Sequence, residues 1–151
     1  MDTFSEKYEA FLLEFGKGRK MALSTSVNNK VSSRMMSVVL IDGKFCFQTD
    51  ATSRKYRQLS ANRNAALCTD NIQIEGICYE IGHPLDNAPF CSRFQECYKG
   101  SYDAYTSLKN ERLFALDPTY IERWVYKDKI PYIERFDLKA RSYEISEYIG
   151  I

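Results

Sequence analysis

Residues 34–55 read RMMSVVLIDGKFCFQTDATSRK, and the pattern in this stretch decides the fold. Asp42-Gly43 separates two runs, residues 35–41 and 44–49, that are rich in apolar and β-branched side chains. Asp-Gly between two such runs is the strongest short-range signal of a β-hairpin. A two-residue loop predicts that Ile41 pairs with Lys44. Continued along both strands, the same register predicts that Val38 pairs with Phe47, Ser37 with Gln48, Met36 with Thr49 and Arg34 with Ala51.

A short helix is predicted directly after the second strand, over residues 53–62. Thr52 or Ser53 has the chemistry of an N-cap, because its hydroxyl can accept a backbone N–H of the first turn. Tyr56 and Leu59 fall on the inner side of this helix. The hairpin and the helix start therefore lie next to each other.

The charges at this helix start oppose the usual preference. A helix N-terminus carries a partial positive charge and normally attracts Asp or Glu, yet this first turn offers Arg54 and Lys55, with Arg57 just behind. A multiply charged anion among these cations would turn repulsion into charge-assisted hydrogen bonds. With Arg34 arriving from the neighbouring strand, we interpret the cluster as a phosphate pocket. The alternative is that these cations point into solvent, as surface Arg and Lys commonly do.

Short polar side chains line the approach to this pocket in the predicted hairpin. Ser37, Gln48 and Thr49 lie on a sheet edge, where they can face a planar heterocycle that has hydrogen-bonding edges. The combination suggests a phosphorylated cofactor that lies along the hairpin.

These residues resemble the FMN-binding core of the pyridoxamine 5'-phosphate oxidase-like split-barrel flavoproteins. The resemblance covers residues 19–82 well and the remainder only by the order of the elements. It implies a split, antiparallel β-barrel, mainly β with flanking helices (α+β). The matching motifs are Arg34-Met35-Met36, Asp42-Gly43, Phe47-Gln48-Thr49, Ser53-Arg54-Lys55, residues 62–67 (NRNAAL) and residues 71–76 (NIQIEG).

The resemblance also implies a role for each matching residue. The FMN phosphate would be held by Arg34, Ser53, Arg54 and Lys55. The ribityl chain and the isoalloxazine ring would be contacted, partly through backbone groups, by Met35, Met36, Ser37, Gln48 and Thr49. In the family the sites form across a homodimer interface, so the flavin would be approached from the second subunit by Asn71 and Gln73.

The chain departs from the oxidase pattern at several positions. Val39 stands where the oxidase keeps a Lys, Gln48 where it has Tyr, and Asn71 where it has Gln. The Arg-rich C-terminal substrate motif of the oxidase is not visible in the last thirty residues, which speaks against oxidation of pyridoxamine phosphate itself. The nitroimidazole-resistance-type reductases of the same fold are similar in size and layout.

The totals predict one ordinary domain over residues 1–151, because this length can bury a single core. Lys and Arg (21) nearly balance Asp and Glu (20), so no global field attracts nucleic acid or an anionic membrane. The N-terminal segment has no long apolar run, so neither a signal peptide nor a membrane span is expected, and we expect a cytoplasmic protein. Five cysteines without a Cys-x-x-Cys pair are expected to be reduced, with Cys46, Cys68 and Cys78 buried in strands.

The remaining elements follow from periodicity and turn signals. A helix is predicted over 3–15, capped by Asp2, Thr3 or Ser5 and stopped by Gly16, and another helix is predicted after the cap residue Asn87. A short helix is expected over 101–108. Strands are predicted over 21–27, 30–41, 65–69, 72–81, 112–116, 119–126 and 130–136, and the tail 137–151 fits either a strand or a docked helix.

The sequence leaves open the roles of two residues outside the motif. Trp124 is either a core residue or an aromatic near the flavin. His83, the only histidine, lies within reach of Cys91 and Cys97, but their spacing matches no zinc motif, which favours a structural role.

No residue set pairs a nucleophile with a base, so any chemistry is expected to belong to the flavin. The first hypothesis is an FMN-dependent oxidoreductase that passes electrons from a reduced nicotinamide cofactor to a small planar acceptor (a nitroaromatic, a quinone or a flavin), or that oxidises a pyridoxamine-phosphate-like amine. The rival is a flavin-binding or electron-carrier module without a substrate. Pyridoxal phosphate and haem rank lower as ligands of the same cleft.

Overall fold

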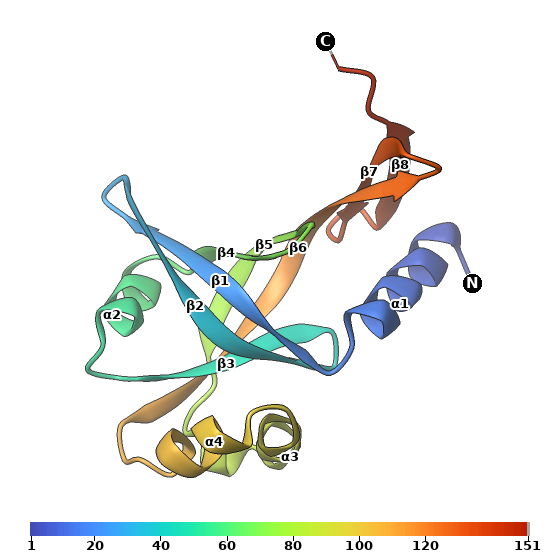
Figure 1. The fold of residues 1–151 in the computed structure, drawn as a ribbon. Helices are drawn as coiled ribbons and strands as arrows, with labels where there is room; N and C mark the ends of the chain where they lie inside the picture. The colour runs from blue at the N-terminus through green and yellow to red at the C-terminus, as the bar shows by residue number, and fades with distance from the viewer. Residues whose placement is uncertain (151) are drawn as a thin grey trace.

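The chain folds around a closed antiparallel β-barrel (Figure 1). A computed structural model describes residues 1–150. Neighbouring strands follow the order β3-β2-β1-β4-β5-β6, and β6 pairs again with β3, which closes the barrel. β2 pairs with β3 only from Val39 to Ile41, so the first part of β2 has one edge without a strand partner. The barrel strands are β1 (Gly18–Val27), β2 (Lys30–Ile41), β3 (Lys44–Asp50), β4 (Asn64–Thr69), β5 (Ile72–Glu80) and β6 (Glu111–Lys127).

Two further strands extend the sheet beyond the barrel, and α1 packs beside them (Figure 1). β7 (Ile130–Asp137) pairs with the second half of β6, and β8 (Ser142–Glu147) pairs with β7. The tail is therefore a strand up to Glu147, and Ile151 lies outside the described residues. The predicted helix over 3–15 is confirmed as α1 (Thr3–Phe15), with Asp2 as its cap. Its buried aromatic residues join the barrel core around Phe136.

A helical segment between β5 and β6 covers the outer face of the barrel. It contains η1 (Pro84–Asp86), α3 (Ala88–Cys97), α4 (Lys99–Ser101) and a single π-helical turn, η2 (Tyr102–Thr106). The predicted cap is confirmed, since the Asn87 side chain accepts the backbone N–H of Phe90 at 3.0 Å. Phe90 and Phe94 pack on Val39, Cys46, Leu113 and Ala115. Both faces of β3 are consequently buried.

The predicted hairpin is confirmed at its turn and is wrong beyond it. Asp42 and Gly43 both have positive φ, and Ile41 pairs with Lys44 as expected. The ladder between β2 and β3 ends at the pair of Val39 and Cys46. From Phe45 to Asp50, β3 pairs with β6, which lies some 65 residues later in the chain. The predicted pairs Val38 with Phe47, Ser37 with Gln48, Met36 with Thr49 and Arg34 with Ala51 are not formed.

The expected break at residues 117–118 is also wrong, because β6 is one continuous strand. The register of β5 against β6 shifts between Glu75 and Gly76, where a bulge places Gly76 opposite Pro118. A Cβ at Gly76 would lie 2.4 Å from the Asp117 carbonyl oxygen, so only glycine fits this close approach. Because the regular ladder is interrupted at the bulge, the strand can contain Pro118, which has no N–H to donate.

The cysteines differ from expectation at one position. Cys46 and Cys78 are buried, and burial raises the pKa of each thiol to about 12. Cys68 points outward from β4 and is exposed, so the prediction of a buried thiol is wrong there. All five thiols are free.

The helix that positions the candidate site is α2 (Arg54–Ala61), which packs against β1 and β3. Its predicted cap is confirmed, because Ser53 Oγ accepts the backbone N–H of Tyr56 at 3.2 Å. Leu59 is fully buried, and Tyr56 packs edge-on against Phe114. These contacts fix the helix start beside the first half of β2, the part that does not pair with β3.

Candidate functional site

A depression lies between the start of α2 and the first half of β2, with a volume of about 330 Å³. Four of the predicted phosphate ligands line it together, although they come from positions up to 21 residues apart in the chain. No Asp or Glu lines it. We call it the first depression, and its lining residues are Ser32, Ser33, Arg34, Ser53, Arg54 and Lys55.

Arg34 is held in position by neutral partners. Its Nη1 donates to the carbonyl oxygen of Leu23 (3.2 Å) and to Thr25 Oγ1 (2.9 Å), and its Nη2 donates to Gln58 Oε1 (2.6 Å). A guanidinium has five N–H donors, so two remain for a ligand. The orientation of Arg34 is thus set before any ligand binds, and its charge is not neutralised.

The cations of the first depression repel one another. Burial and the neighbouring charge of Arg54 lower the pKa of Arg34. Burial and the charge of Arg34 likewise lower the pKa of Lys55, although Glu111 and Asp50 act in the opposite direction. Within residues 1–150, no ion pair includes any of the three cations. A bound anion would relieve this repulsion.

Thr49 supports the cap beneath the first depression. Its hydroxyl lies 3.1 Å from Ser53 Oγ, and the residue is only 3% exposed. Thr49 therefore orients the Ser53 hydroxyl and does not form part of the wall.

The other residues expected along the flavin do not form one surface with their side chains. Gln48 is buried, and its Oε1 accepts the hydroxyl proton of Thr106 at 3.0 Å, so it faces the helical segment. Met36 is 8% exposed and belongs to the barrel core, whereas Met35 is 62% exposed on the outer face of β2. Ser37 is half-buried on that same outer face. The expectation that Ser37, Gln48 and Thr49 line one approach is wrong, because alternate residues of a strand point to opposite faces and the two strands separate.

Asn71 and Gln73 lie elsewhere in the same chain. Both are exposed at the β4–β5 turn, in another depression of about 410 Å³ that Trp124 also lines. Asn71 Nδ2 donates to the carbonyl oxygen of Trp124. Trp124 is half-buried against Tyr148, with ring centroids 4.9 Å apart, so it is not a core residue. Neither Asn71 nor Gln73 lines the first depression.

Residues beyond the predicted set complete the first depression. Ser32 and Ser33 line it from β2. Gln58 is buried, and its side chain hydrogen-bonds two residues of β2. Its Oε1 accepts from Arg34, and its Nε2 donates to Ser32 Oγ at 3.1 Å. Its position one helical turn after Arg54 places it on the same face of α2, a signal that the sequence already contains.

His83 has a structural role. Its Nδ1 accepts the backbone N–H of Leu85 (3.1 Å), and its Nε2 lies 2.8 Å from the carbonyl oxygen of Leu108. Both ring nitrogens thus have backbone partners. The thiol of Cys91 donates to the carbonyl oxygen of Pro84, and no group of three potential metal ligands occurs within residues 1–150.

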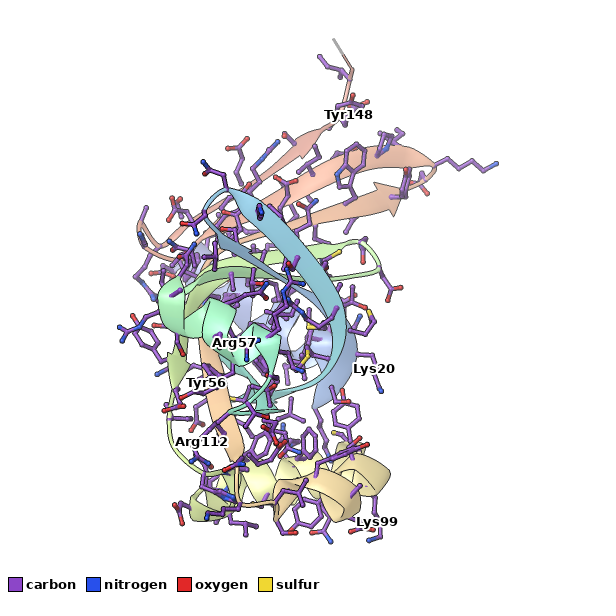
Figure 2. The ribbon with its side chains drawn as sticks, turned by 90° about the vertical axis from the view of Figure 1, so that its left-hand side faces the viewer. Lys20, Tyr56, Arg57, Lys99, Arg112 and Tyr148 are labelled. Atoms are coloured by element: carbon purple, nitrogen blue, oxygen red, sulfur yellow. The ribbon has the colours of Figure 1, made fainter. Side chains whose placement is uncertain are left out.

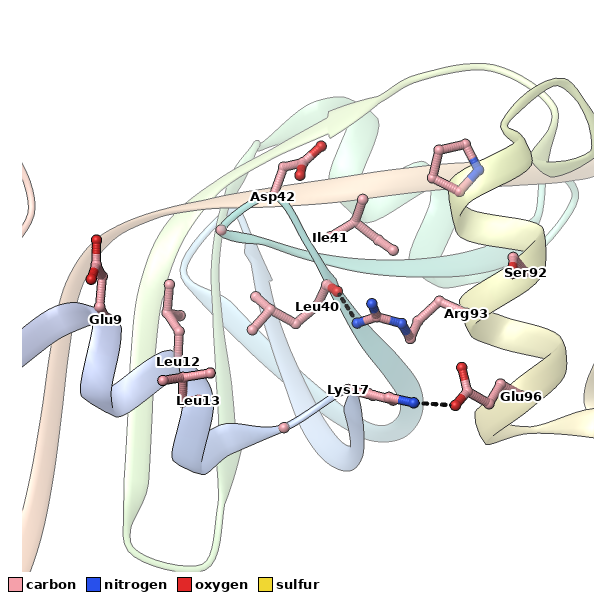
Figure 3. A pocket seen from close by; sticks show the side chains of 13 residues that line it. Glu9, Leu12, Leu13, Lys17, Leu40, Ile41, Asp42, Ser92, Arg93 and Glu96 are labelled. Atoms are coloured by element: carbon pink, nitrogen blue, oxygen red, sulfur yellow. Dashed lines mark hydrogen bonds and ion pairs between the residues drawn. The ribbon is translucent and has the colours of Figure 1, made fainter.

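A larger depression, of about 1010 Å³, lies between α1, the β2–β3 turn and α3 (Figure 3). Lys17 and Glu96 form an ion pair across it, and Arg93 Nη1 donates to the carbonyl oxygen of Leu40 at 2.9 Å. No residue of the predicted site lines it. Figure 2 shows that Tyr56 and Arg57 lie at α2, whereas Lys99 and Tyr148 lie toward opposite ends of the molecule.

The fold is that of the FMN-binding split-barrel proteins related to pyridoxamine 5'-phosphate oxidase. The chain matches such an FMN-binding protein from Nostoc punctiforme at a TM-score of 0.63 and 14% identity, covering 99% of this chain and 98% of that one. It matches a NimC/NimA family protein from Clostridium acetobutylicum at a TM-score of 0.56 and 14% identity, with 95% and 92% covered. It also matches HutZ, the heme storage protein from Vibrio cholerae, at a TM-score of 0.58 and 14% identity, with 76% and 89% covered.

The sequence itself matches no protein-family profile and no curated protein. At these identities the structural matches establish the fold and not the ligand. Within residues 1–150, no helix combines the length and the apolar character that crossing a bilayer requires.

Proposed function

We propose that the chain binds FMN, with the FMN phosphate in the first depression, and acts as an FMN-dependent oxidoreductase. The observation that carries this proposal is the convergence of Arg34, Arg54 and Lys55 on one depression that contains no carboxylate. A phosphate supplies the missing negative charge and accepts the free N–H groups. The fold is shared with a protein described as FMN-binding.

The residues of this chain would bind and orient the cofactor. Arg34, Ser53, Arg54 and Lys55 would hold the phosphate, and Thr49 would orient the Ser53 hydroxyl. Met35 and Ser37 are accessible to the rest of the flavin from the outer face of β2. Met36 and Gln48 have side chains engaged in the protein, so they would contribute backbone groups.

When bound, FMN supplies electron transfer from a reduced nicotinamide cofactor to a small planar acceptor such as a nitroaromatic, a quinone or another flavin, or from a pyridoxamine-phosphate-like amine. The lining of the first depression contains hydroxyl, guanidinium and ammonium groups and no carboxylate or imidazole. These side chains bind and orient, and they offer no general base.

We further propose that the protein is a cytoplasmic homodimer in which Asn71 and Gln73 approach the flavin site of a second copy. Both side chains are exposed and lie outside the first depression of their own chain. The free thiols of all five cysteines suit a reducing compartment.

A non-catalytic flavin-binding or electron-carrier module is the second candidate. The observation in its favour is that the first depression is small and that the large one is lined by none of the site residues. The shared fold with a heme storage protein also fits a binding role.

The first experiment is a visible spectrum of the purified protein, followed by release and identification of the chromophore. FMN, or stoichiometric uptake of added FMN, is the expected result, and a colourless protein that refuses FMN overturns the proposal. An anaerobic titration with NADPH and NADH then separates the candidates. Bleaching and recolouring by an acceptor identify an oxidoreductase, whereas no response to either donor identifies the carrier.

A further inference from the structure

A second depression adjoins the first one on the other side of Arg54, with a volume of about 380 Å³. Arg54 lines both depressions. Gln58 lines the second and accepts the Nη2–H of Arg34 from the first at 2.6 Å. The two are therefore parts of one continuous surface. The residues that line the second depression are Val27, Asn28, Lys30, Arg54, Arg57 and Gln58.

The two depressions together concentrate positive charge. Five cations line them, and neither lining includes an Asp or a Glu. None of the five forms an ion pair within the described part of the chain, although other arginines, such as Arg123 and Arg135, do. The whole chain carries a formal charge of only +1, so this excess is local. The five cations are Lys30, Arg34, Arg54, Lys55 and Arg57.

The second depression lies between two elements, the β1–β2 turn and α2. The turn has Asn28 and Asn29 at φ values of 51° and 63°, and it lies on the same side of the barrel as α2 (Figure 1). Arg57 Nη1 donates to the carbonyl oxygen of Thr52 at 3.0 Å, which folds its side chain back along the helix start. Lys30 begins β2 on the opposite wall and is exposed.

One phosphate does not account for five cations. A phosphate monoester carries about two negative charges at neutral pH, which Arg34 and Lys55 balance in the first depression. Lys30 and Arg57 remain for a further anion of similar charge, and Arg54 can contact both anions because it lines both depressions. Such an anion would accept charge-assisted hydrogen bonds from them.

We propose that the second depression binds a second phosphate group, carried by the nucleotide that donates electrons to the flavin, so that the protein prefers the phosphorylated nicotinamide cofactor. This inference rests on the proposed FMN site in the first depression. The same chemistry has another source, the second phosphate of a flavin dinucleotide. The experiment separates the two sources.

Calorimetric titrations of the FMN-loaded protein with NADP⁺ and NAD⁺ test the proposal, because these nucleotides differ only in one phosphate and do not reduce the flavin. We expect NADP⁺ to bind at least tenfold more tightly than NAD⁺. The Lys30→Ala/Arg57→Ala variant should lose this preference and keep its FMN affinity. The matched control is Lys44→Ala/Lys109→Ala, which removes two exposed lysines that line neither depression and should keep the preference.

Titration of the flavin-free protein with FMN and FAD forms the second arm. If the Lys30→Ala/Arg57→Ala variant loses affinity for FAD and not for FMN, the second phosphate is that of a flavin dinucleotide. Equal changes in all affinities, or no change in any, overturn the second phosphate site. Failure of the unaltered protein to bind FMN would instead overturn the function proposed for the first depression, so the two failures are distinguishable.

Discussion

Two half-buried arginines of this barrel have opposite environments. Arg123 on β6 donates to Glu134 Oε1 (2.7 Å) and to Glu14 Oε2 (2.8 Å), and Glu134 also accepts the hydroxyl proton of Tyr143. Burial lowers the pKa of Arg123, but the two carboxylates more than offset it, so the net shift is upward. Arg34 has only neutral partners, and both burial and the charge of Arg54 lower its pKa.

The difference separates a structural arginine from a ligand-binding one. The cluster around Arg123 joins α1 to β6, β7 and β8, and its cation is paired with two carboxylates of the same chain. The cluster around Arg34 has its geometry fixed but its charge unbalanced. Buried charges are normally paired, so the unbalanced cluster is the one that needs an external partner.

The largest expected effect comes from removing the unbalanced charges. The Arg54→Ala/Lys55→Ala variant should bind FMN at least 100-fold more weakly, because each lost charge-assisted hydrogen bond is worth about 1.5–3 kcal/mol. Its flavin-free form should unfold at no lower urea concentration than the unaltered protein, since repulsion is removed. Fluorescence titration measures the affinity, and Lys44→Ala/Lys109→Ala serves as the charge control. Unchanged FMN affinity would contradict a phosphate site at α2.

The balanced cluster should respond in the opposite way. Glu134 is 7% exposed, and Glu134→Ala leaves Arg123 without its buried partner, which should cost about 3 kcal/mol of unfolding free energy. Glu144→Ala is the matched control, because its carboxylate is 68% exposed and pairs with Arg135 at 3.6 Å. That change should cost less than about 0.5 kcal/mol. Urea unfolding measures both, and equal costs would refute the distinction.

Binding of FMN should stabilise the protein through the first depression. At 100 times its dissociation constant, FMN should add about 2.7 kcal/mol to the free energy of unfolding. Thermal unfolding with and without FMN measures this shift at constant ionic strength. The Glu144→Ala variant should show the full shift and the Arg54→Ala/Lys55→Ala variant almost none. A full shift in the latter would place the ligand elsewhere.

The features of the α2 site that depend on neighbouring residues were predictable from sequence. Helix α2, its Ser53 cap and the cations of its first turn follow from neighbouring residues, and the Asp42-Gly43 turn brings β2 back toward them. The meeting of Arg34 with Arg54 and Lys55 was therefore predicted, and it is observed.

The non-local part was not predictable, because β3 has a different partner on each of its edges. It pairs with β2 only from Lys44 to Cys46, whereas β6 pairs along its other edge from Phe45 to Asp50 and closes the barrel, and no nearby residue signals this second pairing. The contact of Gln48 with Thr106 is likewise made with a segment far away in the chain. The bulge at Gly76 likewise depends on β6, so the continuity of β6 through Pro118 had no local signal.

The smallest expected effect concerns an acid that faces the unbalanced cluster without pairing with it. Glu111 is the first residue of β6, lies opposite Asp50 and is 5% exposed. Burial and the charge of Asp50 raise its pKa, while Lys55 and His83 act in the opposite direction. A carboxyl whose pKa is raised on folding contributes stability only at low pH, and that contribution is lost as pH rises through the raised pKa.

Glu111→Gln removes this loss, because the amide stays neutral at every pH. The variant should therefore be more stable than the unaltered protein at pH 7, by on the order of 0.5 kcal/mol, and the advantage should shrink as pH falls toward 4.5. Urea unfolding across this range measures it, with the exposed Glu75→Gln as the control. An advantage that grows toward acid pH would show that the Glu111 carboxylate balances Lys55, and the cluster at α2 would then resemble the one around Arg123.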